Sequence, residues 1–351
     1  MAAVKLGSVA RECRQNWAGT VEGVPIVGLE HLIPEEITLS SWNSDTDNTF
    51  SKKFEKGQVL LGRRRVYLKK AAIAPFDGIC SGDITVIEAI PGKIAPELLP
   101  FIIQNDKFFD YAMQGSAGSL SPRVKWEHLK DYEFELPDIL EQRKLADKLW
   151  AAYRLKQSYK KMIEATDEMV KSRFIEMFGG DNWAQKSLGE VGSFTRGGGF
   201  QKSDFVEDGI PCIHYGQIHT RFGPFISSHI TEISSELASK TRFASKGDLI
   251  IAITSEDAEG SCKSTAWLGD YPVAVGAHAA IYNHCMNPLY MSFFFKSALF
   301  NHAKMEYIHG TKVVEIRPDD IAKILVPCPP MSLQEQFAAI AEQSDKSKYL
   351  S

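Results

Sequence analysis

The chain contains two related halves, and this internal repeat constrains its fold more than any other feature of the sequence. LGSV at 6–9 returns as LGEV at 188–191, and GVPIVGL at 23–29 returns as GIPCIHY at 209–215. FEKGQVLL at 54–61 matches ASKGDLII at 244–251, where Gly57 or Gly247 leads into an apolar run that predicts a strand. Because the segments keep their order, the sequence predicts one domain architecture that is used twice.

The repeat continues through the last part of each half. Residues 95–112 correspond to 287–304, and both segments predict an amphipathic helix that begins near a proline. Residues 125–149 parallel 317–343, where a short helix leads to an apolar strand, a proline and a new helix starting near Glu141-Gln142 or Glu335-Gln336. Each half is therefore expected to be a mixed domain of short strands and few helices that ends by starting a helix.

A long helix is predicted between the two halves. From Ile139 to Phe178 the sequence contains no Pro or Gly and is rich in good helix formers, and Gly179-Gly180 then stop it. About forty residues at 1.5 Å each would span about 60 Å. Apolar or small residues recur along it at spacings near three and four, which predicts a coiled-coil seam for an antiparallel partner helix: Leu145, Leu149, Ala152, Tyr159, Ile163, Thr166 and Val170.

These patterns predict an α+β fold in which two duplicated mixed domains are joined by a long helix that can form a coiled coil. The expected boundaries are 1–138 for the first domain, 139–180 for the connecting helix, 181–330 for the second domain and 331–351 for a second helix. That last helix is much shorter than the first. We therefore expect it to supply only a short piece of the antiparallel partner, with another subunit, or self-association through the long helix, supplying the rest.

Composition is that of a folded protein, with 44% hydrophobic and 24% charged residues. No signal peptide and no apolar segment of membrane-spanning length is found, so we expect a cytoplasmic protein without a membrane partner.

The net charge of −4 argues against coating of nucleic acid by a broad basic surface. One local exception is residues 52–70, which hold eight Lys or Arg and a single Glu. A charge run is as often a solvated face as a binding site.

Polar, basic and aromatic residues gather in predicted loops of both halves, and these are the residue types that contact bases and phosphates. The candidates in the first half are Arg63, Arg64, Arg65, Tyr67, Lys69, Lys70, Ser121, Arg123 and Lys125. Those in the second half are Arg196, Lys202, Tyr215, Gln217, His219, Thr220, Arg221, Ser255, Lys263, Thr311 and Lys312. Each half thus has its own set of candidate DNA-binding side chains.

No catalytic constellation is predicted. Asn287-Pro288-Leu289-Tyr290 faintly resembles the Asn-Pro-Pro-Tyr loop with which adenine methyltransferases hold a flipped base, but the repeat places it at a helix start. Pro318-Asp319-Asp320 suits a helix N-terminus better than a nuclease site. The glycines of TRGGGF at 195–200 lack the context of a dinucleotide or phosphate-binding loop, and no metal-ligand spacing occurs.

Two stretches, GRRRVYLKKAAIAPFDGICSGDITVI at 62–87 and TRGGGFQKSDFVEDGIPCIHYGQIHT at 195–220, together with the repeated Glu-Gln helix starts, resemble the specificity subunits of type I restriction-modification systems. The resemblance covers almost the whole chain and departs from the family at the short C-terminal helix. It implies a non-catalytic subunit whose two target-recognition domains read the halves of a split double-stranded DNA target.

The resemblance also implies partners. Modification subunits would bring S-adenosylmethionine and methylate adenine, and through them restriction subunits would bring ATP and Mg²⁺, with no cofactor in this chain itself. Two other interpretations stay open at this point. The chain could be a truncated, inactive or donor copy that cannot assemble, or a DNA methyltransferase in its own right, which the missing cofactor motifs disfavour.

Overall fold

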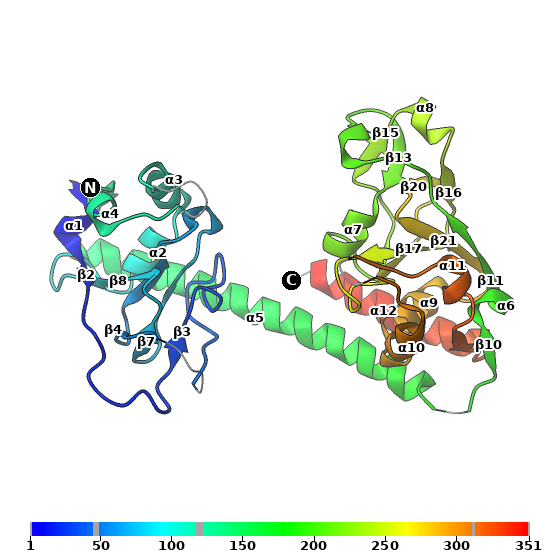
Figure 1. The fold of residues 1–351 in the computed structure, drawn as a ribbon, viewed down its shortest axis with the longest axis horizontal. Coiled ribbons are helices and arrows are strands. Elements are labelled where there is room, and N and C mark those ends of the chain that lie inside the picture. The colour runs from blue at the N-terminus through cyan, green and yellow to red at the C-terminus, as the bar shows by residue number, and fades with distance from the viewer. Residues whose placement is uncertain (1, 45–48, 117–121, 181, 311–312, 350–351) are drawn as a thin grey trace. The chain divides into compact units, whose positions relative to one another are not determined.

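The computed structural model describes residues 2–44, 49–116, 122–180, 182–310 and 313–349, and side chains up to 345 in the last helix. The chain divides into two compact units, residues 1–158 (unit 1) and 159–351 (unit 2) (Figure 1). Helix α5 (Ile139–Phe178) runs without a break across the boundary. The predicted long helix is therefore present, and it ends directly before Gly179, as the sequence indicates.

Unit 1 is built from short strands and a few short helices ahead of α5. Its elements are β1 (Ala2–Lys5), α1 (Leu6–Val9), β2 (Ala10–Cys13), β3 (Ile26–Val27), β4 (Lys52–Phe54), β5 (Val59–Gly62), the 3₁₀ turn η1 (Val66–Leu68), β6 (Ala71–Ile73), β7 (Gly78–Cys80), β8 (Ile84–Ala89), α2 (Leu99–Ile103), α3 (Asp106–Gln114), α4 (Trp126–Leu129) and β9 (Glu133–Leu136).

Unit 2 repeats this order after the end of α5 and adds short elements. Its elements are β10 (Gln185–Ser187), α6 (Leu188–Val191), β11 (Gly192–Arg196), η2 (Lys202–Asp204), β12 (Phe205–Val206), β13 (Ile210–Ile213), α7 (Tyr215–Thr220), β14 (Phe225–Ile226), β15 (Thr231–Ile233), α8 (Ser235–Ala238), β16 (Arg242–Ala244), β17 (Leu249–Ala252), β18 (Thr254–Ser255), β19 (Ser264–Trp267), β20 (Val273–Val275), β21 (Ala279–His284), α9 (Pro288–Lys296), α10 (Ala298–Lys304), η3 (Met305–Tyr307), β22 (Val314–Glu315), α11 (Pro318–Ile321), β23 (Leu325–Pro327) and α12 (Met331–Tyr349).

Strand pairing is the same in the two units. The antiparallel order β2-β8-β5-β6 recurs as β11-β21-β17-β19, and β3-β7-β4, with one parallel and one antiparallel pair, recurs as β13-β20-β16. The small ladder β1-β9 recurs as β10-β23. The predicted α+β fold with a duplicated mixed architecture is therefore confirmed.

The repeated sequence motifs have repeated physical causes. Gly57 and Gly247 both adopt a positive φ, +88° and +96°, at the turn before the central strand, a conformation that favours glycine. Gly7 and Gly189 instead allow a close approach, because a Cβ at either position would meet the backbone oxygen of Lys130 or Ala322 at 3.2 or 3.3 Å.

The central strands are buried on both faces, with alternate side chains entering different cores. In unit 1, Val59 and Leu61 join one cluster, while Leu60 joins the other. In unit 2, Leu249 and Ile251 pack in one cluster and Ile250 in another. These runs are therefore continuous in apolar character and carry no polar face.

The prediction of one helix over 95–112 and one over 287–304 is wrong, because each segment forms two helices. Asn105 caps α3 by accepting a hydrogen bond from the Lys107 amide, and Ser297 caps α10 by accepting one from Phe300. Such polar side chains compete with the backbone for hydrogen bonds, which interrupts a helix despite a favourable apolar pattern. Asn287 caps α9 by accepting hydrogen bonds from the amides of Leu289 and Tyr290. The tetrapeptide at 287–290 is therefore the helix start that the repeat predicts.

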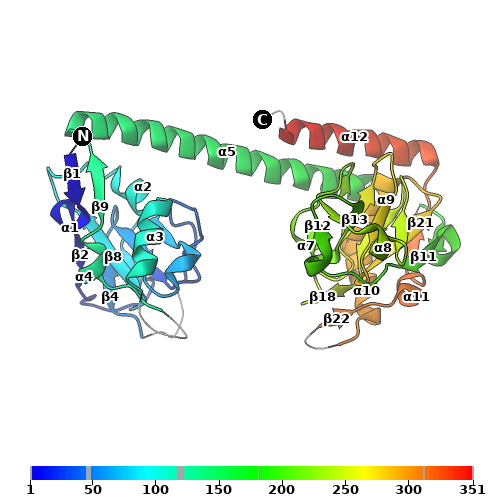
Figure 2. The ribbon, with the colours of Figure 1, turned by 90° about the horizontal axis from the view of Figure 1, so that it is seen from above.

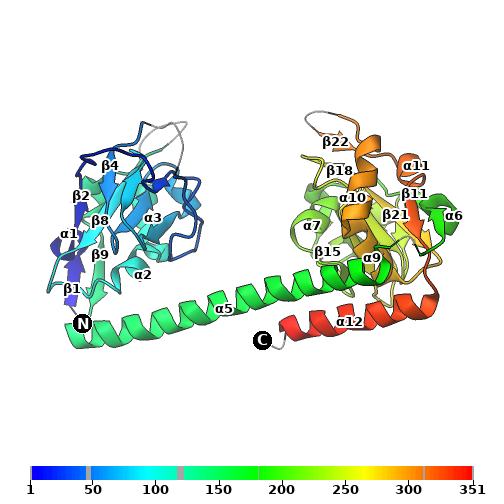
Figure 3. The same ribbon diagram turned by 90° about the horizontal axis from the view of Figure 1, so that it is seen from below.

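In unit 2, α12 lies antiparallel to the last turns of α5, as Figures 2 and 3 both show. Phe337 of α12 packs with its ring centroid 5.2 Å from that of Phe174 and 5.8 Å from that of Phe178.

The residues of the predicted coiled-coil seam differ in burial. Val170 is buried in the unit 2 core, and Leu149 packs against the unit 1 core. Tyr159, Ile163 and Thr166 are half-buried. Leu145 and Ala152 are exposed.

Candidate nucleic-acid interface

The arginine run of unit 1 lies at the end of strand β5, beside the segment that follows the undescribed residues 117–121. The Arg63 amide donates to the Asp83 carbonyl, and the Arg65 amide donates to the Pro122 carbonyl, each with an N–O distance of 2.9 Å. The Val124 amide donates to the Arg63 carbonyl at the same distance. Backbone hydrogen bonds therefore bring Arg63–Arg65 and Arg123, which are far apart in sequence, to one edge.

Asp83 organises the cations at this edge. Its carboxylate accepts hydrogen bonds from Arg123 Nε at 2.8 Å and Arg123 Nη2 at 3.3 Å, and Arg64 Nη1 lies 3.7 Å away. The hydrogen bonds from Arg123 hold the pKa of the Asp83 carboxyl below its usual value. Among the described residues, the buried Arg63 Nε has no hydrogen-bond partner. A single carboxylate thus orients two guanidinium groups, an arrangement that preorganises planar donors.

The turn after Arg64 projects an aromatic side chain. Arg65 and Lys69 both have positive φ, 54° and 51°, and flank the η1 turn, where Val66 is buried and Tyr67 is 54% exposed. Lys69 pairs with Asp106 of α3, and Lys70 Nζ donates to the Leu29 carbonyl at 2.8 Å. Lys69 and Lys70 therefore also hold the turn in place, while Arg65, Tyr67 and the exposed Lys125 at the start of α4 face solvent.

Unit 2 has the same backbone arrangement with different side chains. The Ile253 amide donates to the His278 carbonyl at 3.0 Å, as Arg63 does to Asp83, and the β18–β22 pair takes the place of the Arg64–Arg123 bridge. Within unit 2, this pair lies on the side away from α5 and α12 (Figure 3). Arg196 reaches it from β11, with Nη2 2.9 Å from the Glu315 carboxylate.

A cavity of about 480 Å³ opens between α7 and the loop that follows β18. It brings together six of the eleven candidates of the second half: Lys202, Tyr215, His219, Thr220, Ser255 and Lys263. The sequence reasoning did not select the six other residues that line it, which are Gly216, Thr254, Glu256, Asp257, Gly260 and Val313. The sequence gives no distinct signal for Glu256 and Asp257 among them, because acidic residues in a loop usually only face solvent. Arg196 and Arg221 do not line this cavity.

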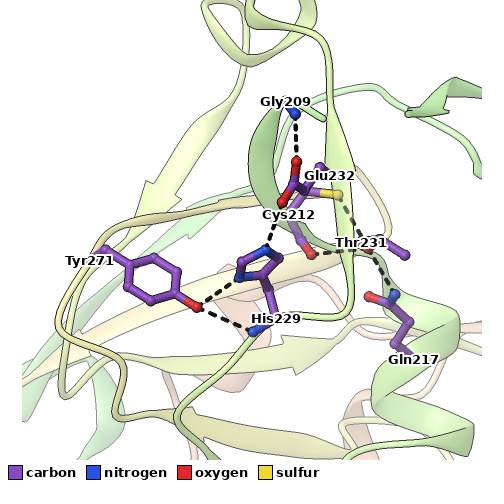
Figure 4. A network of polar contacts seen from close by, with 7 residues as sticks. All are labelled: Gly209, Cys212, Gln217, His229, Thr231, Glu232 and Tyr271. Carbon is purple, nitrogen blue, oxygen red and sulfur yellow. Dashed lines mark hydrogen bonds and ion pairs between the residues drawn. The ribbon is translucent and has the colours of Figure 1, made fainter. Parts of the chain in front are cut away.

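Gln217 lies in the interior, where its amide is already used. Its Oε1 accepts from the His214 amide at 2.9 Å. Its Nε2 donates to Thr231 Oγ1 at 2.9 Å, as Figure 4 shows. These contacts fix the start of α7 to Thr231 of strand β15, and the next residue of that strand, Glu232, pairs with His229 at 3.1 Å. Gln217 therefore positions Tyr215 and His219 rather than presenting its own amide to a ligand.

The loop after β18 is held by hydrogen bonds among its own polar groups and by a buried lysine of α10. The Gly260 amide donates to Asp257 Oδ1 at 2.5 Å, and the Asp257 amide donates to Ser255 Oγ at 3.4 Å. Lys304, from α10, is 2% exposed and donates to the carbonyls of Ser261 at 2.7 Å and Glu259 at 3.1 Å. Burial lowers the pKa of Lys304, so its interior position has to be offset by these hydrogen bonds.

Three of the predicted candidates, Ser121, Thr311 and Lys312, lie outside the described residues. Within the described ranges, no cluster of three or more His, Cys, Asp or Glu side chains is arranged to hold a metal ion. In the same part of the chain, no helix combines the length and the apolar character needed to cross a bilayer.

Residues 180–349 match the family model described as the type I restriction modification DNA specificity domain. The EcoDI type I restriction enzyme specificity subunit of Escherichia coli is 25% identical over 169 residues, which is 44% of this chain and 37% of that protein. The second half of the chain is therefore similar to type I restriction-modification specificity subunits. The matched region is thus little more than a third of the curated relative.

Solved structures share the fold over nearly the whole chain. The type I restriction-modification S subunit from M. genitalium matches with a TM-score of 0.58 and 12% identity, covering 99% of this chain and 90% of that one. A chain from a structure of type I system complex assembly and conformational transition matches with a TM-score of 0.52 and 19% identity, covering 99% and 92%. The specificity-subunit family has no catalytic activity of its own, in line with the sequence-based expectation for this chain.

Proposed function

We propose that this chain reads a bipartite DNA target, with one half-site contacted by each unit. The observation that carries the proposal is that both units use the same backbone hydrogen bonds to place different polar side chains at equivalent loop positions. The Arg63 and Ile253 amides make the corresponding bonds to Asp83 and His278. Equivalent scaffolds with unlike side chains suit the recognition of two unlike half-sites.

The arginine edge of unit 1 would supply direct base contacts. Arg64 and Arg123 share the Asp83 carboxylate, and an oriented guanidinium can donate two hydrogen bonds to guanine O6 and N7. The exposed Arg65, Tyr67 and Lys125 would contact phosphates and sugars beside it. In unit 2, Lys202, His219, Thr220 and Lys263 would take the corresponding roles around the cavity.

The connecting helix would set the distance between the two contacts. A continuous helix of 40 residues is about 60 Å long, and the length of unread DNA between half-sites would follow from it, as subunit geometry sets half-site spacing in other DNA-binding proteins. We propose that residues 1–138 and residues 181–330 form the two recognition domains that this helix connects.

The same helix offers a surface for partner subunits. Leu155, Met162 and Met169 recur every seven residues and are each about half exposed. With Tyr159 and Thr166 between them, they form the pattern of a coiled-coil face. We propose that modification subunits, which would carry S-adenosylmethionine and methylate adenine, dock along this face. Through them, restriction subunits would bring ATP and Mg²⁺ to the complex.

The proposal is tested by sequencing DNA methylation in cells that express the modification subunit with or without this chain. A split adenine-methylation motif that requires the chain is the expected result. An Arg64→Ala variant should relax one half of that motif and weaken its binding by about 1–3 kcal/mol, leaving the other half unchanged. Arg143→Ala, at an exposed position on α5, is the matched control. Methylation that is unaffected by removal of the chain contradicts the proposal.

A further inference from the structure

The loop after β18 presents an unneutralised carboxylate one residue beyond the positions that correspond to the arginines of unit 1. Ser255 pairs with Val314 in β18–β22, just as the Arg65 amide pairs with the Pro122 carbonyl. Glu256 follows directly and lines the 480 Å³ cavity with an exposed side chain. Among the described residues, no Lys, Arg or His lies within ion-pair distance of its carboxylate. An unpaired carboxylate is repelled by phosphates, so a DNA-facing position for it needs a specific reason.

The backbone around Glu256 is preorganised. Hydrogen bonds from the Asp257 and Gly260 amides close the turn, and Lys304 fixes the carbonyls of Glu259 and Ser261 from the interior. A held loop places a side chain at a defined position with little loss of conformational entropy on binding. The loop thus has the rigidity that direct base recognition requires.

The other acidic residues of the loop do not compete for this role. Asp257 Oδ1 already accepts the Gly260 amide, so its carboxylate is part of the turn. Glu259 is exposed but does not line the cavity. Lys202 and Lys263 do line it and would contact phosphates on either side, which offsets the negative charge of Glu256.

We propose that Glu256 is a specificity-determining residue of unit 2, whose carboxylate accepts a hydrogen bond from an exocyclic amino group in the major groove, that of cytosine or of adenine. This inference rests on the proposed function. Carboxylates accept from cytosine N4, and the adenine N6 amino group offers the same chemistry. Unit 1 would then read base acceptors through arginine, while unit 2 reads a base donor through glutamate.

The test is a binding experiment on the full chain in complex with its modification subunit. DNA duplexes carry the split target, and each cytosine or adenine of the half-site that Arg64→Ala leaves intact is replaced in turn. The replacement for cytosine is 2-pyrimidinone and that for adenine is purine, each of which lacks only the amino group. The expected result is about a tenfold or greater loss of affinity at one position with the wild-type chain, and little or none at that position with Glu256→Ala.

The position of the effect distinguishes cytosine from adenine, and Glu259→Ala is the matched control that should behave like the wild-type chain. The inference is overturned if every analogue weakens binding equally in the wild-type chain and in Glu256→Ala. It is also overturned if Glu256→Ala changes affinity by the same factor for all duplexes, which would mark a purely electrostatic effect. Loss of all sequence preference in the wild-type complex would instead overturn the proposed function and this inference with it.

Discussion

The two candidate recognition edges share a backbone and differ in charge. Arg64, Asp83 and Arg123 of unit 1 occupy the positions that Thr254, His278 and Glu315 occupy in unit 2, as the matching backbone hydrogen bonds establish. In unit 1 a carboxylate joins two arginines, whereas in unit 2 Thr254 Oγ1 lies 3.2 Å from His278 Nδ1 and Glu315 pairs with Arg196. The difference teaches that the strand ends fix positions, while the side chains on them can change chemistry without changing the fold.

The starts of the two long helices differ in another way. Gln142 and Gln334 are buried and make the same two hydrogen bonds, accepting from the amide of Ala95 or Asn287 and donating to the carbonyl of Pro137 or Pro329. Three residues further on, Leu145 is 43% exposed, whereas Phe337 is fully buried against Phe174 and Phe178. One helix start is therefore covered by a second helix within its unit, and the other presents its apolar side chain to solvent.

The largest effect is expected at this helix contact. Phe337→Ala should lower the free energy of unfolding of unit 2 by about 3–5 kcal/mol, because it leaves a cavity among aromatic rings. Leu145→Ala should lower that of unit 1 by less than about 1 kcal/mol, since little buried area is lost. Urea unfolding followed by circular dichroism measures both. Equal losses would show that the two helix starts are not packed differently.

An intermediate and equal effect is expected at the buried glutamines. Gln142→Ala and Gln334→Ala should each cost about 1–3 kcal/mol, because each leaves a buried amide and a buried carbonyl without partners. Gln336→Ala, at an exposed position two residues after Gln334, should cost less than about 0.5 kcal/mol. Thermal unfolding of the three variants distinguishes them. A larger loss for Gln336→Ala than for Gln334→Ala would overturn the equivalence of the two helix starts.

The smallest effect is expected from the pH-dependent contact between Asp83 and Arg123 in unit 1. The Asp83 carboxyl has a lowered pKa in the folded state, chiefly because Arg123 donates hydrogen bonds to it. Its contribution to stability is therefore complete at pH values above the ordinary pKa of 3.8 and is lost as the pH falls through the lower pKa of the folded state. Because Arg123 is about half exposed, Arg123→Gln should cost less than about 1 kcal/mol at pH 7. The difference from the wild-type chain should vanish in strong acid. An equal difference at pH 7 and pH 2 would contradict this account.

Sequence patterns were sufficient for the parts of the fold that depend on local periodicity and repetition. The absence of Pro and Gly predicts α5 almost to the residue, and the two glycine turns identify the duplicated strands. The same reasoning paired Glu141-Gln142 with Glu335-Gln336, whereas the hydrogen bonds pair Gln142 with Gln334. A two-residue shift leaves the sequence match nearly as good, and only burial distinguishes the glutamine that faces the domain.

The sequence by itself determined the duplication, the long helix and the family resemblance, because each depends on the order and spacing of residues along the chain. Only the tertiary structure decided which polar residues meet. Asp83 contacts Arg123 across 40 residues, and Lys304 supports a loop more than 40 residues before it. Gln217, a plausible base-reading residue by type, is instead used inside the domain. Strand pairing sets these contacts, and their partners carry no local signal in the sequence.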